Sequence, residues 1–114
     1  MQKIQLALSD STYSEALRRS LAKDWAFQDW QVELVSVPKP QKADVLVIDS
    51  AALERVRLPL PHPERVVLIT RNEPEQLSRA WEAGIVSVVF ERELISTTML
   101  AILAARYRAG KSAA

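Results

Sequence analysis

Two runs of apolar residues constrain the fold of this chain more than any other feature of its sequence. VLVID (residues 45–49) and VVLIT (residues 66–70) each place four consecutive apolar residues ahead of a polar one. A strand with one face in water alternates apolar and polar side chains, whereas a strand buried on both faces of a parallel sheet has a continuous apolar run. We therefore expect both runs to be central strands of a parallel sheet. The second strand is expected to include Arg65 ahead of its apolar run and to cover residues 65–70.

Three other segments also have the pattern of strands. KIQLALS (3–9) alternates apolar and polar side chains, while QVELVSV (31–37) and IVSVVF (85–90) are rich in valine. The two connections on either side of the first buried run are short. PKPQK, after residue 37, contains two prolines and leaves no room for a normal helix, and AALERV, after residue 50, can form two turns at most.

Two helices are marked by capping motifs. Thr12 and Glu15 form a T-x-x-E capping box, and Asn72 and Glu75 form a similar pair around a first-turn proline. Gly84 is placed to end the second of these helices.

A third helix is expected from about residue 96 to 109, with Gly110 ending it. Apolar residues recur at helical spacing in all three helices. The residues expected on their buried faces are Tyr13, Leu17, Leu21, Trp25, Leu77, Ala80, Trp81, Met99, Ile102, Leu103 and Tyr107.

Alternating strands and helices predict one α/β domain over residues 1–110, followed by a disordered tail at 111–114. In such parallel sheets, sites lie where the strands end. The polar or loop residues expected at that edge are Ser9, Asp10, Asp49, Thr70 and residues 90–92.

Composition excludes several classes of function. The 15 basic and 14 acidic residues leave no electrostatic footprint for nucleic acid or an anionic membrane. The chain has no cysteine and one histidine, His62, expected in an exposed loop, so neither a transition-metal site nor a Ser-His-Asp triad is expected. Two glycines cannot build a nucleotide-binding loop. The N-terminus lacks the features of a signal peptide, and we expect a cytoplasmic protein that is not an enzyme.

This set of features resembles the receiver domain of bacterial two-component response regulators, a flavodoxin-like three-layer α/β sandwich. VLVIDS places Asp49 where receivers keep the phosphorylated aspartate, and VVLIT places Thr70 at their switch hydroxyl. WEAGIVSVVFERE is similar to the helix, glycine and final strand of a receiver. The resemblance implies a five-stranded parallel sheet of order 2-1-3-4-5, here with the second and third helices shortened or missing.

The sequence departs from the receiver pattern where phosphoryl chemistry would need it most. In that family an acidic pair after the first strand binds Mg²⁺ with the phospho-acceptor, but Leu8 and Ser9 align with that pair and only Asp10 lies beside it. The family's lysine after the fifth strand is replaced by Glu91, which would repel a phosphate. Arg92 could offer a positive charge, but strand alternation directs it to the opposite side.

Three roles for Asp49 follow from these observations. Its carboxylate could cap the short AALER turn by accepting backbone N–H groups, with no chemistry involved. It could be a working phosphorylation site, with Asp10 and Asp49 as weak Mg²⁺ ligands. It could also contribute to a cation or small-ligand site.

The segment DWAFQDW (24–30) allows two interpretations. Its two tryptophans and one phenylalanine could form a hydrophobic plug under the connection from the first helix to the second strand. They could instead form an exposed aromatic patch, because tryptophan is enriched at protein interfaces.

Our leading hypothesis is a degenerate receiver, or pseudo-receiver, that acts through protein contacts without phosphorylation and needs no cofactor. The resemblance implies that a protein partner or a second copy binds through the fourth helix, fifth strand and fifth helix, a face that would include Arg79, Val86, Val88 and Arg106. The alternative is an atypical working receiver, phosphorylated on Asp49 with Mg²⁺. A third hypothesis is a flavodoxin-like domain that binds a small ligand.

Overall fold

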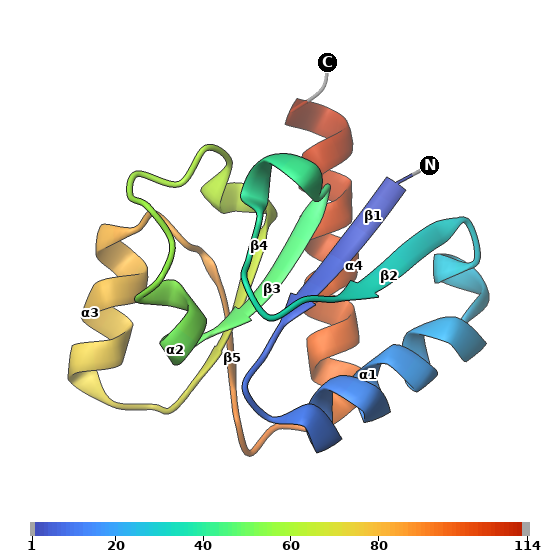
Figure 1. Ribbon diagram of the computed structural model, residues 1–114, viewed down its shortest axis with the longest axis horizontal. Helices are drawn as coiled ribbons and strands as arrows, with labels where there is room; N and C mark the ends of the chain where they lie inside the picture. Colours follow the sequence, from blue (N-terminus) through green and yellow to red (C-terminus); the bar gives the residue numbers. More distant parts are fainter. Residues whose placement is uncertain (1, 113–114) are drawn as a thin grey trace.

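The computed structural model describes residues 2–112, with side chains through residue 108. Within this range the chain forms one parallel sheet flanked by helices (Figure 1). The strands are β1 (Gln2–Ala7), β2 (Trp30–Leu34), β3 (Val45–Asp49), β4 (Val66–Thr70) and β5 (Ser87–Phe90). The α-helices are α1 (Ser11–Lys23), α2 (Ser50–Leu53), α3 (Pro74–Glu82) and α4 (Ile95–Ser112), and the 3₁₀ turns are η1 (Trp25–Phe27), η2 (Pro40–Lys42) and η3 (Pro63–Arg65).

The strands follow the order β2-β1-β3-β4-β5, and all neighbours are parallel, as predicted. The two continuous apolar runs became β3 and β4, in the middle of the sheet. The register pairs Asp49 with Ile69 and Thr70 with Phe90. The strands therefore end close together at one edge, which brings the polar residues that follow them into one region.

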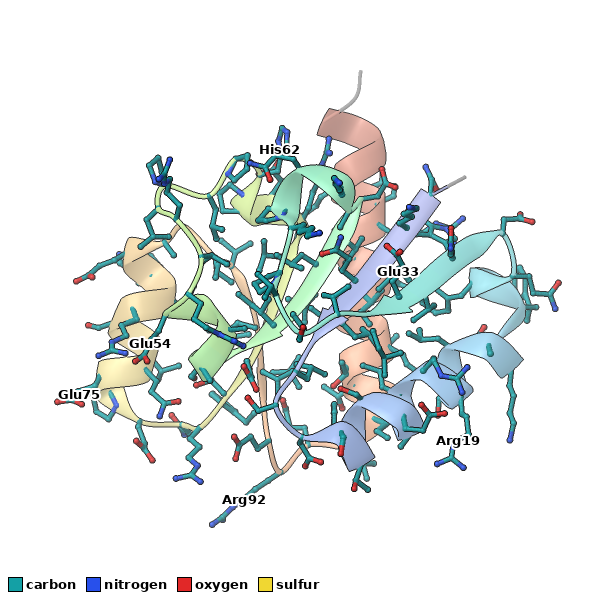
Figure 2. The ribbon with its side chains drawn as sticks, viewed as in Figure 1. Arg19, Glu33, Glu54, His62, Glu75 and Arg92 are labelled. Carbon is teal, nitrogen blue, oxygen red and sulfur yellow. The ribbon has the colours of Figure 1, made fainter. Side chains whose placement is uncertain are left out.

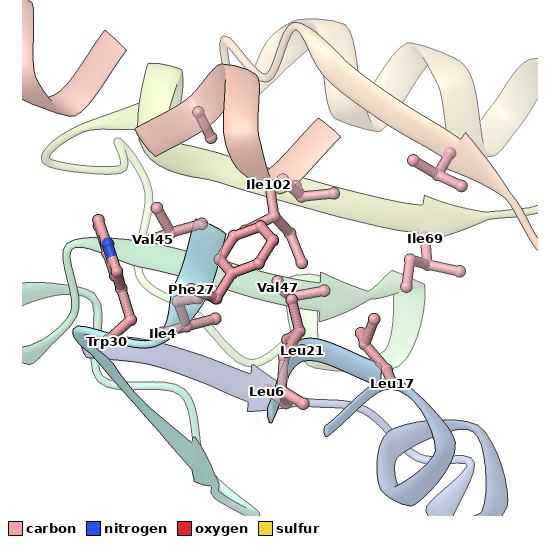
Figure 3. Packing of buried hydrophobic residues seen from close by; sticks show 13 residues of the cluster. Ile4, Leu6, Leu17, Leu21, Phe27, Trp30, Val45, Val47, Ile69 and Ile102 are labelled. Carbon is pink, nitrogen blue, oxygen red and sulfur yellow. The ribbon is translucent and has the colours of Figure 1, made fainter. Parts of the chain in front are cut away.

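Each face of the sheet carries its own hydrophobic cluster. On one face, α1 and α4 cover the odd-numbered residues of β3 and β4 and the even-numbered residues of β1. Figure 3 shows this packing around Leu21, Val47 and Ile102. On the other face, α2 and α3 cover Leu46, Ile48 and Leu68. Burial of both faces is the physical reason that β3 and β4 contain no polar residue before their last position.

The connections around β3 are short, as the sequence predicted. Between β2 and β3 the chain forms only the turn η2, because the prolines there cannot continue a regular helix. After β3, α2 has only four residues. Among residues 2–112, no helix is both long enough and apolar enough to cross a membrane.

The starts of two helices differ from the sequence prediction. The cap of α1 is Asp10 rather than Thr12, because the Asp10 carboxylate accepts the Tyr13 N–H at 3.0 Å and the helix begins two residues earlier than the capping box implied. Helix α3 begins at Pro74 with Glu73 in the cap position and no side-chain cap. Pro74 fixes the first-turn geometry without Asn72.

Three aromatic residues predicted to be buried are exposed. Trp25 is 82% exposed because α1 ends at Lys23 and Trp25 belongs to η1. Trp81 is 81% exposed because Ala80 and Ala83 form the sheet-facing side of α3. Tyr107 is 65% exposed on α4, whose buried side holds Ile102 and Ala105 instead.

The segment 24–30 combines both interpretations offered for it. Phe27 and Trp30 are buried against the α1–α4 cluster, and Arg106 of α4 stacks over the Trp30 ring at 5.1 Å from its centroid. Of the three aromatic residues in the segment, Trp25 lies in solvent. The hydrophobic plug is therefore formed by the second half of the segment.

Element boundaries shift by a few residues from those predicted. β1 ends at Ala7, β2 ends at Leu34 and β5 begins at Ser87, so each strand is shorter than its apolar pattern. Helix α4 continues through Gly110 to Ser112. Residues 113 and 114 of the expected tail lie outside the described residues. Gly84 ends α3 with φ of +80°, as predicted.

Candidate functional site

A cleft of about 420 Å³ opens where the strands end. Three carboxylates predicted to meet there do so: Asp10 before α1, Asp49 at the end of β3, and Glu91 after β5. The full lining is Leu8, Asp10, Tyr13, Asp49, Ile69, Arg71 and Glu91. An adjoining cleft of about 760 Å³ lies between the β4–α3 and β5–α4 loops and shares Arg71 and Glu91.

Both carboxylate oxygens of Asp49 accept backbone N–H groups. Oδ1 accepts from Ala52 at 2.9 Å, which makes Asp49 the cap of α2. Oδ2 accepts from Ser9 at 2.7 Å, across the gap between β1 and β3. The capping role predicted from the AALER turn is confirmed, and the bond to Ser9 adds a long-range contact. These two bonds give both oxygens of the carboxylate a partner at the edge of the core.

The Asp10 carboxylate is also committed to a backbone group, because it caps α1 through the Tyr13 N–H. Leu8 and Ser9 supply no carboxylate beside it. Mg²⁺ requires a near-octahedral set of oxygen ligands, and the described residues contain no group of three or more His, Cys, Asp or Glu side chains that could hold a metal ion. The donor set in this cleft therefore does not fit a receiver-type Mg²⁺ site.

Glu91 lies in the cleft and pairs with Arg71. The Arg71 Nε lies 3.3 Å from the Glu91 Oε2. Arg71 follows β4, whereas the sequence led us to look for a cation only among the residues after β5. We therefore did not predict this pair. Figure 2 shows Arg92 projecting away from the body of the molecule, so the positive charge lining the cleft comes from Arg71 rather than from Arg92.

Thr70 is close to Asp49 in the sheet but its side chain lies on the other face. Ile69 lines the cleft, so the next residue along the strand points to the α2–α3 side. The Thr70 hydroxyl contacts Ser50 at 2.6 Å and also contacts Gln76. The residue is only 1% exposed. Thr70 thus occupies the sequence position predicted for the switch hydroxyl, but its hydroxyl does not line the cleft that contains Asp49.

Tyr13 forms one wall of the cleft and connects α1 to α4. Its hydroxyl lies 2.6 Å from the hydroxyl of Thr98, which is fully buried. Partial burial raises the pKa of Tyr13 above its ordinary value of 10.0, and the negative charge of Glu93 acts in the same direction, while the Thr98 bond opposes them. Tyr13 is therefore neutral at physiological pH.

The four residues predicted on an interaction face do not form one surface. Arg79 pairs with Glu54, the residue after α2, Val86 is 64% exposed before β5, and Val88 packs partly against the α2–α3 cluster. Arg106 lies elsewhere, because its guanidinium donates to the Ala26 carbonyl and covers Trp30.

Trp81 is the exposed residue of this region that sequence analysis missed. Helical spacing from Leu77 placed it on the buried face. The signal available in the sequence was the run of small residues Ala80, Ala83 and Gly84, which lets α3 approach the sheet on that side and leaves Trp81 pointing away.

No family model matches this chain, and no curated protein matches it. Solved structures do match its fold. The receiver domain of HemR from Leptospira biflexa is 14% identical with a TM-score of 0.67, covering 93% of this chain and 94% of that one. A CheY-like response regulator receiver domain protein from Methanospirillum hungatei is 14% identical with a TM-score of 0.65, covering 98% of both chains.

A chain from Burkholderia pseudomallei described as pilus assembly-related is 23% identical with a TM-score of 0.65, covering 95% of this chain and 91% of that one. These similarities show that the protein has the receiver fold, as the sequence resemblance implied. At such identities they concern the fold alone.

Proposed function

We propose that this protein is a cytoplasmic signal-transduction module with a receiver fold that acts through protein contacts and without phosphorylation of Asp49. The observation that carries the proposal is the pair of backbone hydrogen bonds to Asp49, one from Ser9 and one from Ala52. A phosphoryl group attached to either oxygen would remove negative charge from that oxygen and weaken the hydrogen bond that it accepts. The carboxylate is therefore used to join β1, β3 and α2.

The charges around Asp49 support the same proposal. Phosphorylation adds negative charge, and Glu91 lines the cleft where a receiver has its lysine. Arg71 is the basic residue that lines this cleft, and it is already paired with Glu91. A phosphate would have to compete with Glu91 for Arg71, which lowers the stability of the modified state.

We place the contact surface on α3, the β5 edge and α4, and its occupant is a protein partner or a second copy of the chain. Trp81 and Val86 are both exposed beside this edge, and tryptophan is enriched at the centres of interfaces. Because Arg106 is held against η1, we omit it from this surface and add Trp81. The pilus assembly-related neighbour indicates that receiver-like folds also occur in proteins whose names do not refer to phosphorelay.

The test is an NMR titration of the labelled protein, first with Mg²⁺ and then with beryllofluoride, a phosphate mimic. We expect no saturable shifts at Ser9, Asp49, Thr70 or Glu91 at millimolar concentrations, because the cleft lacks the metal ligands and the lysine. Saturable shifts clustered at these residues would overturn the proposal. They would favour an atypical receiver phosphorylated on Asp49. This is the second candidate function, because Asp10 and Asp49 line the same cleft.

The third hypothesis, a small-ligand site, uses the same cleft. The walls of this cleft combine the apolar side chains of Leu8 and Ile69 with charged groups at the rim. A small molecule that shifts the Leu8 and Ile69 methyl resonances while Mg²⁺ and beryllofluoride do not would support ligand binding without phosphorylation.

A further inference from the structure

A compact set of hydrogen bonds joins the start of α2 and the end of β4 to the first turn of α3. The Ser50 and Thr70 hydroxyls lie 2.6 Å apart, and the Ser50 hydroxyl lies 2.8 Å from the Gln76 Oε1. The Thr70 hydroxyl also donates to the Gln76 Oε1. Two hydroxyls, one from α2 and one from β4, therefore meet at one amide oxygen of α3.

The orientation of the Gln76 amide follows from its other two contacts. Its Oε1 accepts the Arg71 backbone N–H at 3.3 Å, and its Nε2 donates to the Glu73 carboxylate at 3.4 Å. The reversed amide would face an N–H with an NH₂ group and a carboxylate with an oxygen, and both contacts would be repulsive. The oxygen consequently points at the two hydroxyls.

We propose that Gln76 is a latch that fixes the χ1 rotamer of Thr70 and ties its hydroxyl to the start of α3, on the face of the sheet that strand alternation already gives this side chain. Thr70 is 1% exposed, so its hydroxyl needs a protein partner. Gln76 and Ser50 provide partners only in the orientation directed at α3. Turning Thr70 away would leave the Gln76 oxygen and the Ser50 hydroxyl without this contact.

The latch fixes two parts of the molecule in one arrangement. It ties the β4–α3 loop to the end of the strand through the Arg71 N–H, and it ties the start of α3 to α2 through Ser50. The inference rests on the proposed function, because it explains why the α3 surface would not respond to events at Asp49. A conformational change there would require breaking this set of bonds first.

The test compares the Gln76→Leu variant with the natural protein in the absence of Mg²⁺ and phosphate mimic. The three-bond couplings from the Thr70 methyl carbon to its backbone nitrogen and to its carbonyl carbon report its χ1 rotamer. We expect a single rotamer in the natural protein and averaged couplings in the variant. We also expect hydrogen exchange of the Arg71 amide to rise about tenfold, since its side-chain acceptor is gone.

Gln31→Leu is the matched control, because Gln31 is exposed on the edge strand β2 and far from this network. It should leave both measurements unchanged. Identical Thr70 couplings and Arg71 exchange in Gln76→Leu and in the natural protein would overturn the latch.

Thr70→Val keeps the shape of the side chain and removes its hydroxyl, so it tests the latch if Gln76→Leu does not fold. The Gln76 side-chain amide resonances should then shift, and unchanged resonances would overturn the proposal. These measurements need no ligand. If Gln76→Leu leaves the Thr70 couplings unchanged and beryllofluoride causes no saturable shifts, the latch is wrong and the proposed function stands. If Gln76→Leu averages the Thr70 couplings and beryllofluoride does cause saturable shifts, only the proposed function is wrong.

Discussion

At the scale of single residues, four aspartates of this protein act as acceptors for backbone N–H groups. Asp10 caps α1, Asp24 accepts the Ala26 N–H in η1, and Asp49 caps α2. Asp44 accepts the Lys3 N–H at 2.8 Å. Asp49 differs in accepting two such groups, one from Ala52 three residues on and one from Ser9 in a distant part of the chain, which makes it a structural joint.

This role predicts the effect of removing the carboxylate. We expect Asp49→Ala to lower the free energy of unfolding by about 1–2 kcal/mol, because α2 loses its cap and the Ser9 N–H loses its acceptor. Asp49→Asn should cost less, since its amide oxygen can still accept one N–H. Urea denaturation followed by circular dichroism measures both.

The matched control for this prediction is Asp29→Ala, at an exposed turn position. A surface aspartate of this kind should change stability by less than about 0.5 kcal/mol. Equal stability of Asp49→Ala and the natural protein would show that Asp49 is not a structural joint and would return attention to chemistry at this residue.

At the scale of elements, the ends of the helices determine where the site residues lie. α3 closes on Gly84, whose positive φ lets the chain turn directly into β5. A Cβ at this position would lie 3.3 Å from the Pro63 Cγ in η3. The turn therefore depends on glycine for two reasons, the backbone conformation and the space beside Pro63.

The two glycines of the chain are expected to respond in opposite ways to the same substitution. Gly84→Ala should lower the free energy of unfolding by about 1–2 kcal/mol, because alanine is strained at positive φ. Gly110 lies within α4, so Gly110→Ala should leave stability unchanged or raise it by up to about 1 kcal/mol. Thermal or urea unfolding of both variants measures the contrast, and destabilisation by Gly110→Ala would contradict a helix that continues past this residue.

At the scale of the whole molecule, two separate hydrophobic clusters support one sheet and leave aromatic groups outside. Of the three tryptophans, Trp30 is 7% exposed, while Trp25 and Trp81 are each more than four-fifths exposed. Trp25 lies in η1, near the β2 edge, and Trp81 lies on α3, toward the β5 edge. Only Trp81 belongs to the proposed contact surface.

If a second copy covers this surface, fluorescence will report it. In a Trp25→Phe variant the exposed emission comes from Trp81, and we expect its quenching by acrylamide to decrease as protein concentration rises. Trp81→Ser should remain monomeric in sedimentation velocity, while Trp25→Ser, the control, should associate as the natural protein does. A monomer at every concentration with constant quenching would exclude a second copy and leave a different protein as the partner.

Much of this architecture could be predicted from the sequence because its causes are local. VLVID and VVLIT identified the buried strands, prolines predicted the short connections, and Gly84 marked the end of α3. Misplaced boundaries, such as the start of α1, arose where two residues could serve as caps. The carboxylate of Asp10 was the acceptor that the helix used.

The sequence by itself determined the parallel sheet, its order through the receiver resemblance, and the meeting of Asp10, Asp49 and Glu91 at one edge. Only the tertiary structure decided what those residues contact. The Ser9 N–H reaches Asp49 across 40 residues, Arg71 reaches Glu91 from the loop after β4, and Gln76 binds Thr70 on the opposite face. Strand and helix patterns depend on neighbours a few residues apart, whereas these partners depend on strand register and on the placement of α3, which arise only when the whole sheet is packed.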